Sequence, residues 1–503
     1  MADVTPIGTI NFRDRSVVFG VKRDDRRRHV YVIGKTGSGK TTLVENMLIH
    51  DIVTGEGVGY LDPHGDSVKR ILRYVPRERI KDVVCFDPSD LEYPIAFNPL
   101  ENVPWEYRHL IASSIMSVFK KIWIDAWSAR MEYILTNVLL ALLEFKGSTL
   151  LDINRMLGED IFRKNIVGQL RDPVVRAFWE NEFARYNPNF RVEAIAPIQN
   201  KVGQFITNPL IRNLIGQPES KLDLRKVMDN KQIFLANLSK GQLGEESSLL
   251  LGGLLITKFQ LAAMSRVDVP EEERKDFFLH IDEFQNFSTE SFVSILSEAR
   301  KYRLNLTLAH QYLDQVVEEI INAVFGNVGT MVVFKVGSLD GERFEKEFIT
   351  VLNNDFVNLP KYHAYVKLLV DGITSRPFLT VTHPNPPEPT QTYGSEIIDY
   401  SRLHYGQHRA IVDARIARMY QGIEASGQEA ARCTNCNQEF FRERRGTETL
   451  CPSCKGFQGT KGGISLKSVA GGGLVSGIRK EKPIEPKVEV DHLAELLRQL
   501  KEE

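Results

Sequence analysis

The residues from Gly34 to Thr41, GKTGSGKT, have the composition and spacing of a loop that binds phosphate groups. The apolar stretch HVYVI precedes the loop, and TLVENMLIHDIV, with the apolar spacing of a helix, follows it. Glycines permit tight turns with positive φ, through which backbone amides at the start of a helix converge on phosphate oxygens. A glycine-rich turn that binds nothing is the alternative, and the flanking strand and helix argue against it. The residues expected to bind the nucleotide are Gly34, Lys35, Thr36, Gly37, Ser38, Gly39, Lys40, Thr41 and Thr42.

Within such a site, two residues of the loop and one acidic pair have specific chemical roles. Lys40 is expected to reach the β- and γ-phosphates, and the hydroxyl group of Thr41 is expected to bind Mg²⁺. The segment DFFLHIDEF predicts an apolar strand that ends at Asp282 and Glu283. Asp282 would hold Mg²⁺ through water, and Glu283 would polarise the water that attacks the γ-phosphate. An acidic pair at a strand end is common, but together with the loop it indicates nucleotide hydrolysis.

A second apolar strand, in NLTLAHQYL, stops at His310 and Gln311. The interval between Glu283 and Gln311 is long enough for one helix and one further strand. In a parallel sheet both strands would end at the same edge, beside the γ-phosphate. We therefore expect Gln311 to sense the γ-phosphate or to orient the attacking water, and simple capping of the strand is the alternative. An extra strand between the phosphate-loop strand and the acidic strand is the plan of motor-type ATPases.

The helix between these two strands ends in LSEARKYRLN, which contains Arg300 and Arg303. An arginine here could reach the nucleotide of a neighbouring subunit, and we assign that catalytic role to Arg300 before Arg303. The alternative is a solvated basic helix end, which also suits the helix dipole.

A further strand ends in DPHGD, from Asp62 to Asp66. Asp62, His64 and Asp66 could couple the nucleotide to a bound polymer. The alternative is a turn formed by the proline and the glycine of this segment.

Taken in order, these segments resemble the HerA–FtsK superfamily of hexameric pumping ATPases, and most closely the TraD/TraG-type coupling ATPases of conjugation and type IV secretion. The resemblance runs from the N-terminus to about residue 410. It implies a RecA-like motor core, a ring-shaped homo-hexamer and DNA pumped through its channel. The segments that carry it are DRRRHVYVIGKTGSGKTT, DPHGD, FNPLE, IDEFQNF, LSEARKYRLNLTLAHQY and GNVGTMVVFKVG.

The chain departs from the membrane-bound members of that family, which carry N-terminal transmembrane helices, because it begins close to the predicted motor. Its longest apolar run, from Ser248 to Met264, is interrupted by Lys258 and Gln260 and is shorter than a membrane span. We expect a buried helix here and no direct membrane span. The expected location is cytoplasmic, or peripheral at the inner membrane through partners.

The predicted fold class is α/β: a RecA-like P-loop motor core with a mostly parallel sheet, an all-α insertion domain and a small C-terminal zinc ribbon. The helical spacing of WSARMEYILTNVLLALLEF indicates the insertion, and HPNPPEPTQT indicates a linker. The predicted parts are a strand-rich lead-in (1–26), the motor core (27–103 and 226–383), the all-α insertion (104–225), a Pro-rich linker (384–396), a basic helix (397–425), the zinc ribbon (430–458), a flexible tail (459–489) and a terminal docking helix (490–503).

The segment CTNCNQEFFRERRGTETLCPSC contains two CxxC pairs separated by a 14-residue spacer. Two thiolate pairs on tight turns suit tetrahedral Zn²⁺, and redox-active pairs are the alternative. Because such a site is closed, the metal would be structural. The RERR run between the pairs suggests that the ribbon docks on nucleic acid or protein. The expected zinc ligands are Cys433, Cys436, Cys451 and Cys454.

The formal net charge of −1 provides no overall basic field, so any contact with DNA must come from local basic loops. The leading hypothesis is a DNA-dependent ATPase that uses ATP and Mg²⁺ to pump single- or double-stranded DNA, or a protein–DNA substrate, through a ring. The rival is a nucleotide-switched protein-secretion ATPase or adaptor with little DNA dependence. The leucines of DHLAELLRQLKEE line one helical face. This helix or the zinc ribbon would recruit a secretion-channel or relaxosome-like protein.

Overall fold

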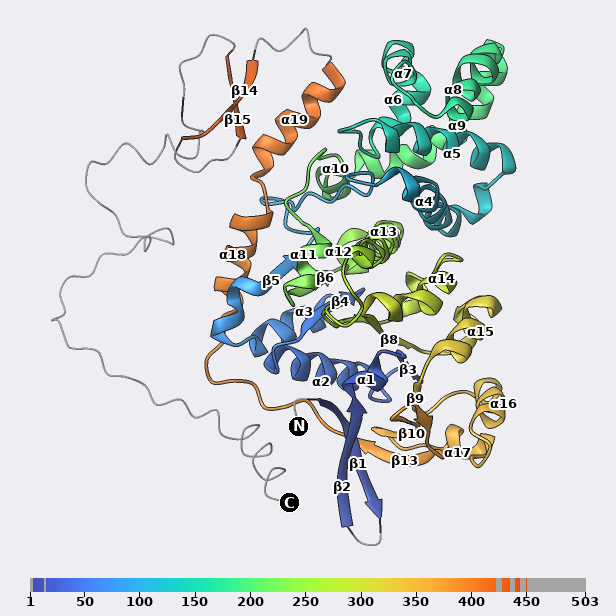
Figure 1. Cartoon of the computed structure of the whole chain (residues 1–503), viewed down its shortest axis with the longest axis vertical. Helices are drawn as coiled ribbons and strands as arrows, with labels where there is room; N and C mark the ends of the chain where they lie inside the picture. Colours follow the sequence, from blue (N-terminus) through green and yellow to red (C-terminus); the bar gives the residue numbers. More distant parts are fainter. Residues whose placement is uncertain (1–2, 13–14, 422–427, 435–438, 444–448, 450–503) are drawn as a thin grey trace, which may run out of the picture. The chain divides into compact units, whose positions relative to one another are not determined.

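The structure is a computed structural model that describes residues 3–12, 15–421, 428–434, 439–443 and 449 (Figure 1). The chain forms two compact units, one from Ala2 to Val412 and one from Asp413 onward. The first unit contains the phosphate loop, the acidic pair and Gln311. It is built around one sheet of 11 strands.

The central strands of this sheet are parallel, and most of their residues are buried on both faces, as in α/β proteins whose helices cover both sides. The strand β8 lies between β3 and β7, which is the order expected for a motor-type ATPase. In spatial order these strands are β9 (Thr330–Val333), β3 (Val30–Ile33), β8 (Leu304–His310), β7 (Phe277–Ile281), β4 (Gly57–Asp62), β6 (Ile233–Asn237) and β5 (Val83–Phe86).

Antiparallel strands extend the sheet beyond β9. The predicted N-terminal lead-in therefore joins the motor sheet, because its hairpin pairs with a strand from the far end of the motor. These strands are β10 (His363–Lys367), β13 (Phe378–Thr382), β1 (Val4–Phe12) and β2 (Arg15–Lys22).

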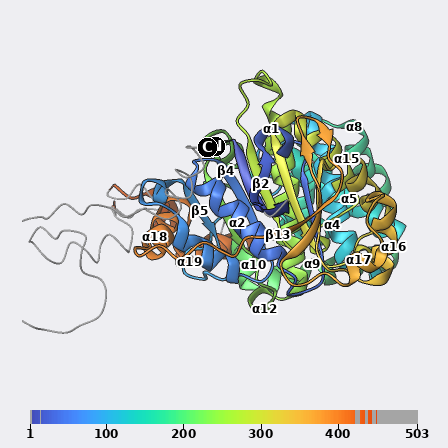
Figure 2. The same cartoon turned by 90° about the horizontal axis from the view of Figure 1, so that it is seen from below.

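Helices α2 (Lys40–Val53) and α13 (Glu245–Met264) cover opposite faces of the sheet. Side chains alternate between the two faces along a strand. Ile233 of β6 belongs to the apolar cluster that includes the buried residues of α2, whereas the ring centroid of the next residue, Phe234, lies 5.3 Å from that of Phe259 in α13. Figure 1 shows β4 and β6 between these two helices, and Figure 2 shows α2 beside the strands.

The expectation of a buried helix from Ser248 to Met264 is confirmed by α13. Within the described residues it is the one helix long and apolar enough to cross a membrane, with a mean hydropathy of 1.4 in its most apolar window. In that window 83% of the residues are buried inside the protein. The apolar surface of α13 is thus already covered by the sheet and by neighbouring helices.

The region between β5 and β6 is helical, as WSARMEYILTNVLLALLEF predicts. Polar residues begin several of these helices, and Ser128, for example, accepts a hydrogen bond from the amide of Met131. Stacked rings join the first helix to a later one: Trp123 lies 4.5 Å from Phe119 and 5.8 Å from Phe205 between ring centroids. The main helices are α4 (Arg108–Ile122), α5 (Ala129–Glu144), α6 (Asp152–Gly158), α7 (Asp160–Val167), α9 (Pro188–Thr207), α10 (Pro209–Ile215) and α11 (Leu224–Asp229).

The single basic helix expected over 397–425 is instead divided into α18 (Gly394–Tyr405) and α19 (Arg409–Gln421). The break falls at Gly406, where an added Cβ would lie 2.7 Å from the carbonyl oxygen of Arg402. A glycine fits this sharp end of α18, whereas the helical periodicity of the sequence continues across it.

The second unit contains a two-stranded antiparallel hairpin, β14 (Gln428–Arg432) and β15 (Glu439–Glu443), next to Cys433. Among the described residues there is no group of three His, Cys, Asp or Glu side chains that could hold a metal. The other three predicted zinc ligands lie outside the described residues, as do the predicted tail and docking helix. These ligands are Cys436, Cys451 and Cys454.

A candidate nucleotide site at the edge of the sheet

The phosphate loop joins the end of β3 to the start of α2. Its backbone requires glycine at Gly37, where φ is 75°, and at Gly39, where φ is 123° and an added Cβ would lie 2.9 Å from the ring of Tyr362. The amide of Tyr362 donates a hydrogen bond to the carbonyl oxygen of Ser38 at 2.8 Å. Tyr362, which comes just before β10, thus supports the loop, and no sequence pattern pointed to it.

Two polar groups inside the loop have the arrangement expected of a site for anions. Lys40 Nζ donates to the carbonyl oxygens of Gly34 at 2.6 Å and Lys35 at 3.3 Å, so the ammonium group bends back over its own loop. Ser38 Oγ is buried and has no hydrogen-bond partner among the described residues. Burial lowers the pKa of Lys40, while the charges of Glu283 and Asp282 oppose this effect. A phosphate group would satisfy both Lys40 and Ser38.

Thr41 and Asp282, the two expected Mg²⁺ residues, lie together. Thr41 Oγ1 donates a hydrogen bond to Asp282 Oδ2 at 3.1 Å, which joins α2 to the end of β7. Burial, and to a smaller extent the charge of Glu283, raises the pKa of Asp282 to about 6. A divalent cation would compensate the two neighbouring carboxylates, and a hydroxyl next to a carboxylate is a suitable oxygen ligand set for Mg²⁺.

Gln311 contacts both the phosphate loop and the acidic pair. Its Oε1 accepts a hydrogen bond from Thr36 Oγ1 at 3.0 Å, and its Nε2 donates to Glu283 Oε1 at 2.8 Å. These contacts exist because Ile33 pairs with His310, and Ile281 pairs with Leu308, so the three strands end at one edge. The side chain of Gln311 therefore joins the phosphate loop to the acidic pair.

Glu283 itself is tightly held. Its backbone has φ 46° and ψ 49°, a left-handed conformation that is uncommon for residues other than glycine. A second amide, Gln285 Nε2, donates to Glu283 Oε2 at 2.6 Å. Both carboxylate oxygens are therefore engaged by amide groups. Sequence reasoning missed Gln285, for which the only signal was its place two residues after Glu283.

His310, directly before Gln311, was also not assigned a role. It is fully buried, and its Nε2 lies 2.5 Å from the hydroxyl oxygen of Tyr31 in β3. Burial, and to a smaller extent the charge of Lys40, lowers the pKa of His310 to about 3. The imidazole is therefore neutral at physiological pH. The neutral ring fixes the end of β8 against β3 and thereby supports Gln311.

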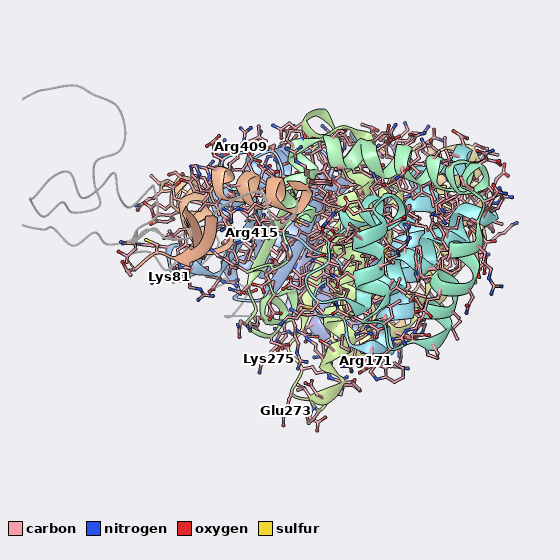
Figure 3. The ribbon with its side chains drawn as sticks, turned by 90° about the horizontal axis from the view of Figure 1, so that it is seen from above. Lys81, Arg171, Glu273, Lys275, Arg409 and Arg415 are labelled. Atoms are coloured by element: carbon pink, nitrogen blue, oxygen red, sulfur yellow. The ribbon has the colours of Figure 1, made fainter. Side chains whose placement is uncertain are left out.

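The structure does not bring Arg300 to this site. Arg300 lies in the short turn η9 (Ala299–Tyr302), just before β8 begins, and therefore at the opposite edge of the sheet. Its charge acts on His29, which precedes β3 at that same edge. The loop that carries Glu273 and Lys275, just before β7, projects from the protein in Figure 3. The side chain of Arg300 is exposed.

The strand that ends in DPHGD forms a turn, as the alternative interpretation predicted. Asp62 Oδ1 accepts a hydrogen bond from the amide of His64 at 2.9 Å, and its Oδ2 accepts one from the amide of Val68 at 3.0 Å. Asp62 is buried and holds the start of α3 (Asp66–Ile71). The carboxylate is thus occupied by backbone amides and has a structural role.

No family model matches the chain. Among curated proteins it is similar to the type 4 coupling protein DotL of Legionella pneumophila subsp. pneumophila, with 21% identity over 355 residues. The match covers 58% of this chain and 44% of DotL, so the chain spans less than half the length of that relative.

Two solved structures share the fold. The plasmid coupling protein TrwB, in complex with ADP and Mg²⁺, superposes with a TM-score of 0.55 at 15% identity, covering 75% of this chain and 90% of TrwB. VirB4 of Thermoanaerobacter pseudethanolicus superposes with a TM-score of 0.50 at 13% identity, covering 76% of this chain and 97% of VirB4. These findings confirm the expected RecA-like motor fold and, together with DotL, the resemblance to coupling ATPases.

The contacts of Gln311 generate a prediction that separates its two interpretations. A Gln311→Ala variant loses the hydrogen bonds to Glu283 and Thr36, so Glu283, the residue expected to polarise the attacking water, loses one of the two amides that hold it. We expect the rate of ATP hydrolysis to fall by about 100-fold, while the affinity for a fluorescent ATP analogue changes little. Gln232→Ala, at the opposite edge of the sheet, is the matched control. If both variants hydrolyse ATP at the wild-type rate, Gln311 only caps its strand.

Proposed function

We propose that this protein is an ATP-driven coupling ATPase that moves DNA, or a protein–DNA substrate, through a ring of subunits in a process like conjugation or type IV secretion. The observation that carries the proposal is the meeting of Thr41, Asp282, Glu283 and Gln311 at one sheet edge, with β8 placed between the two strands of the nucleotide site. The likeness to DotL and TrwB supports this choice among motor-type ATPases.

In this proposal ATP is the substrate and Mg²⁺ supplies positive charge at its phosphate oxygens. Lys40 turns from its own loop carbonyls toward the phosphates, and the loop amides complete their binding. Thr41 and Asp282 hold the metal from two different elements. Glu283 accepts the proton of the attacking water, and Gln311 relays the presence of the γ-phosphate to Glu283.

A ring would complete the site. Arg300 is exposed at the edge of the sheet opposite Lys40, so a head-to-tail arrangement of copies could bring it to a neighbour's nucleotide. A positive charge there would stabilise the transition state. We propose a homo-hexamer, which is the ring size that the resemblance to pumping ATPases implies.

A second candidate function is a protein-secretion ATPase or adaptor with little DNA dependence. The net charge of −1 favours it, because the chain has no overall basic field for a polyanion. In either case we propose that the protein acts in the cytoplasm or at the inner membrane, recruited to a secretion channel or a relaxosome-like complex through its zinc ribbon or terminal helix.

We also propose that Cys433, Cys436, Cys451 and Cys454 bind one structural Zn²⁺, on the strength of their spacing. Their pairing suits a closed tetrahedral site with no direct role in catalysis.

The zinc proposal predicts about one Zn²⁺ per purified chain, measured by elemental analysis. Cys451→Ser should lower the metal content, because a thiolate ligand is lost, while basal ATP hydrolysis should persist. Cys85→Ser is the control, since Cys85 lies on β5, far in the sequence from the four ligands. A chain that carries no metal, yet forms disulfides between these cysteines, would instead indicate redox pairs.

The proposed function predicts that DNA stimulates ATP hydrolysis. We would measure turnover without polymer, with single-stranded DNA and with duplex DNA, at low and moderate salt. Stimulation should fade as salt rises, because contacts with phosphates release counterions. Glu283→Gln should reduce turnover by about 100-fold or more with each polymer while ATP stays bound.

Equal turnover under all three conditions, from assembled protein, would favour the protein-secretion ATPase. Wild-type turnover by Glu283→Gln would show that the base has been assigned to the wrong residue.

A further inference from the structure

The loop that follows Glu283 has a second set of contacts, which come from outside the nucleotide site. This loop begins with η8 (Phe284–Asn286) and ends at α14 (Phe292–Glu298). It carries Gln285, whose side-chain amide donates to Glu283 Oε2 at 2.6 Å. Gln285 Oε1 is buried and has no partner among the described residues, so this side chain is held by its donor end only.

Lys121, near the end of α4 in the helical region, donates to the backbone of this loop. Its Nζ lies 2.5 Å from the carbonyl oxygen of Gln285 and 2.5 Å from that of Ser288, and 3.3 Å from Ser288 Oγ. An ammonium group has three N–H donors. All three therefore have acceptors in the segment that fixes Gln285, and Lys121 is half-buried over it.

The preceding residue, Lys120, provides a contrast. Its Nζ lies 3.1 Å from Glu290 Oε1, at the far end of the same loop. Both side chains of that ion pair are exposed, with 45% and 70% of their surfaces accessible. Exposed ion pairs of this kind contribute little to the stability of a protein. The two neighbouring lysines thus touch the same loop, but only Lys121 holds its backbone beside Gln285.

Helix α13 packs closely against both α4 and the loop. A Cβ at Gly253 would lie 2.7 Å from Val118 of α4, and one at Gly252 would lie 2.2 Å from the ring of Phe287 in the loop. The two adjacent glycines let α4 and Phe287 lie next to each other against α13. Lys121 then connects α4 to the loop through its hydrogen bonds. Directly after α4, the ring of Trp123 stacks on the ring of Phe205, which belongs to α9.

From these contacts we propose that Lys121 is a positioning residue through which the helical region controls Glu283. In the described state, Lys121 fixes the backbone of Gln285, and Gln285 with Gln311 engages both oxygens of Glu283. A displacement of α4 would withdraw the ammonium group, leave two carbonyl oxygens without their donor and let the loop relax. Gln285 would then release Glu283 Oε2 for the attacking water. The inference rests on the proposed function, because it takes Glu283 as the residue that orients this water.

The backbone of Glu283 suits such a switch. A non-glycine residue in the left-handed region costs free energy and persists only where its surroundings enforce it. Loss of one enforcing contact therefore favours a different conformation of residues 283–288. A polymer bound at the helical region would act on hydrolysis through the contacts that run from α4 to Lys121, to Gln285 and to Glu283.

The test compares Lys121→Met with Lys120→Met in the full-length chain. Methionine keeps the length of the side chain and removes its charge. For Lys121→Met we expect ATP hydrolysis without polymer to rise by about five-fold and the ratio of stimulated to basal rate to fall by a similar factor, because the coupling is lost. For Lys120→Met both quantities should stay within about two-fold of the wild type. Lys121→Arg, which keeps the donors, should retain most of the stimulation.

A purely structural role for Lys121 would lower the basal and stimulated rates together and leave their ratio unchanged, and that result would overturn the proposal. If Lys121→Met does not fold, Gln285→Ala tests the same step, because it frees Glu283 Oε2 without disturbing α4. It should also raise the basal rate by about five-fold. A basal rate that falls would mean that the amide holds Glu283 in its productive position.

A second measurement does not depend on hydrolysis. Hydrogen exchange of the amides in residues 284–291, in protein without nucleotide, should be faster in Lys121→Met than in Lys120→Met. Equal exchange in the two variants would overturn the inference. A wild type that DNA does not stimulate would instead contradict the proposed function, and the exchange rates and basal turnover would still decide the role of Lys121.

Discussion

The carboxyl ends of neighbouring parallel strands meet at one edge of a sheet, and the candidate nucleotide site depends on this constraint. The strands β3, β8 and β7 end at this same edge, so the phosphate loop, Gln311 and the acidic pair come together from distant parts of the sequence. Inserting β8 between the other two strands places one glutamine within reach of both Thr36 and Glu283. The antiparallel strands and the helical layers hold this edge in place.

Much of this edge was predictable because its signals are local. Three signals are each contained in fewer than ten residues: the glycine-rich loop, the apolar strand before Asp282 and the strand that stops at Gln311. The parallel pairing of the strands then follows from the order of the elements. The buried helix α13 was likewise predictable, since two polar residues interrupt its apolar run. The sequence left two interpretations of Asp62 open. Its carboxylate accepts hydrogen bonds from two backbone amides, which favours the interpretation as a turn.

The features that sequence reasoning missed arise from contacts between distant segments. Lys121 has no local pattern that distinguishes it from Lys120, and their contacts differ only in the folded protein. Tyr362 supports a loop that it meets only after folding. Gln285 is an exception, because it contacts Glu283, two residues before it, through the local turn at the end of β7. The division of the basic helix at Gly406 was missed for a different reason: apolar periodicity continues across the break, and one glycine is weak information on its own.

The most direct test of this account is the structure of the Glu283→Gln variant with ATP and Mg²⁺, determined by cryo-electron microscopy on assembled protein. We predict phosphates in the loop with Lys40 turned toward them, Mg²⁺ between Thr41 and Asp282, and Gln311 beside the γ-phosphate. An arginine from the adjacent subunit should face the same nucleotide. ATP bound elsewhere, or a γ-phosphate out of reach of Gln311 and residue 283, would contradict it.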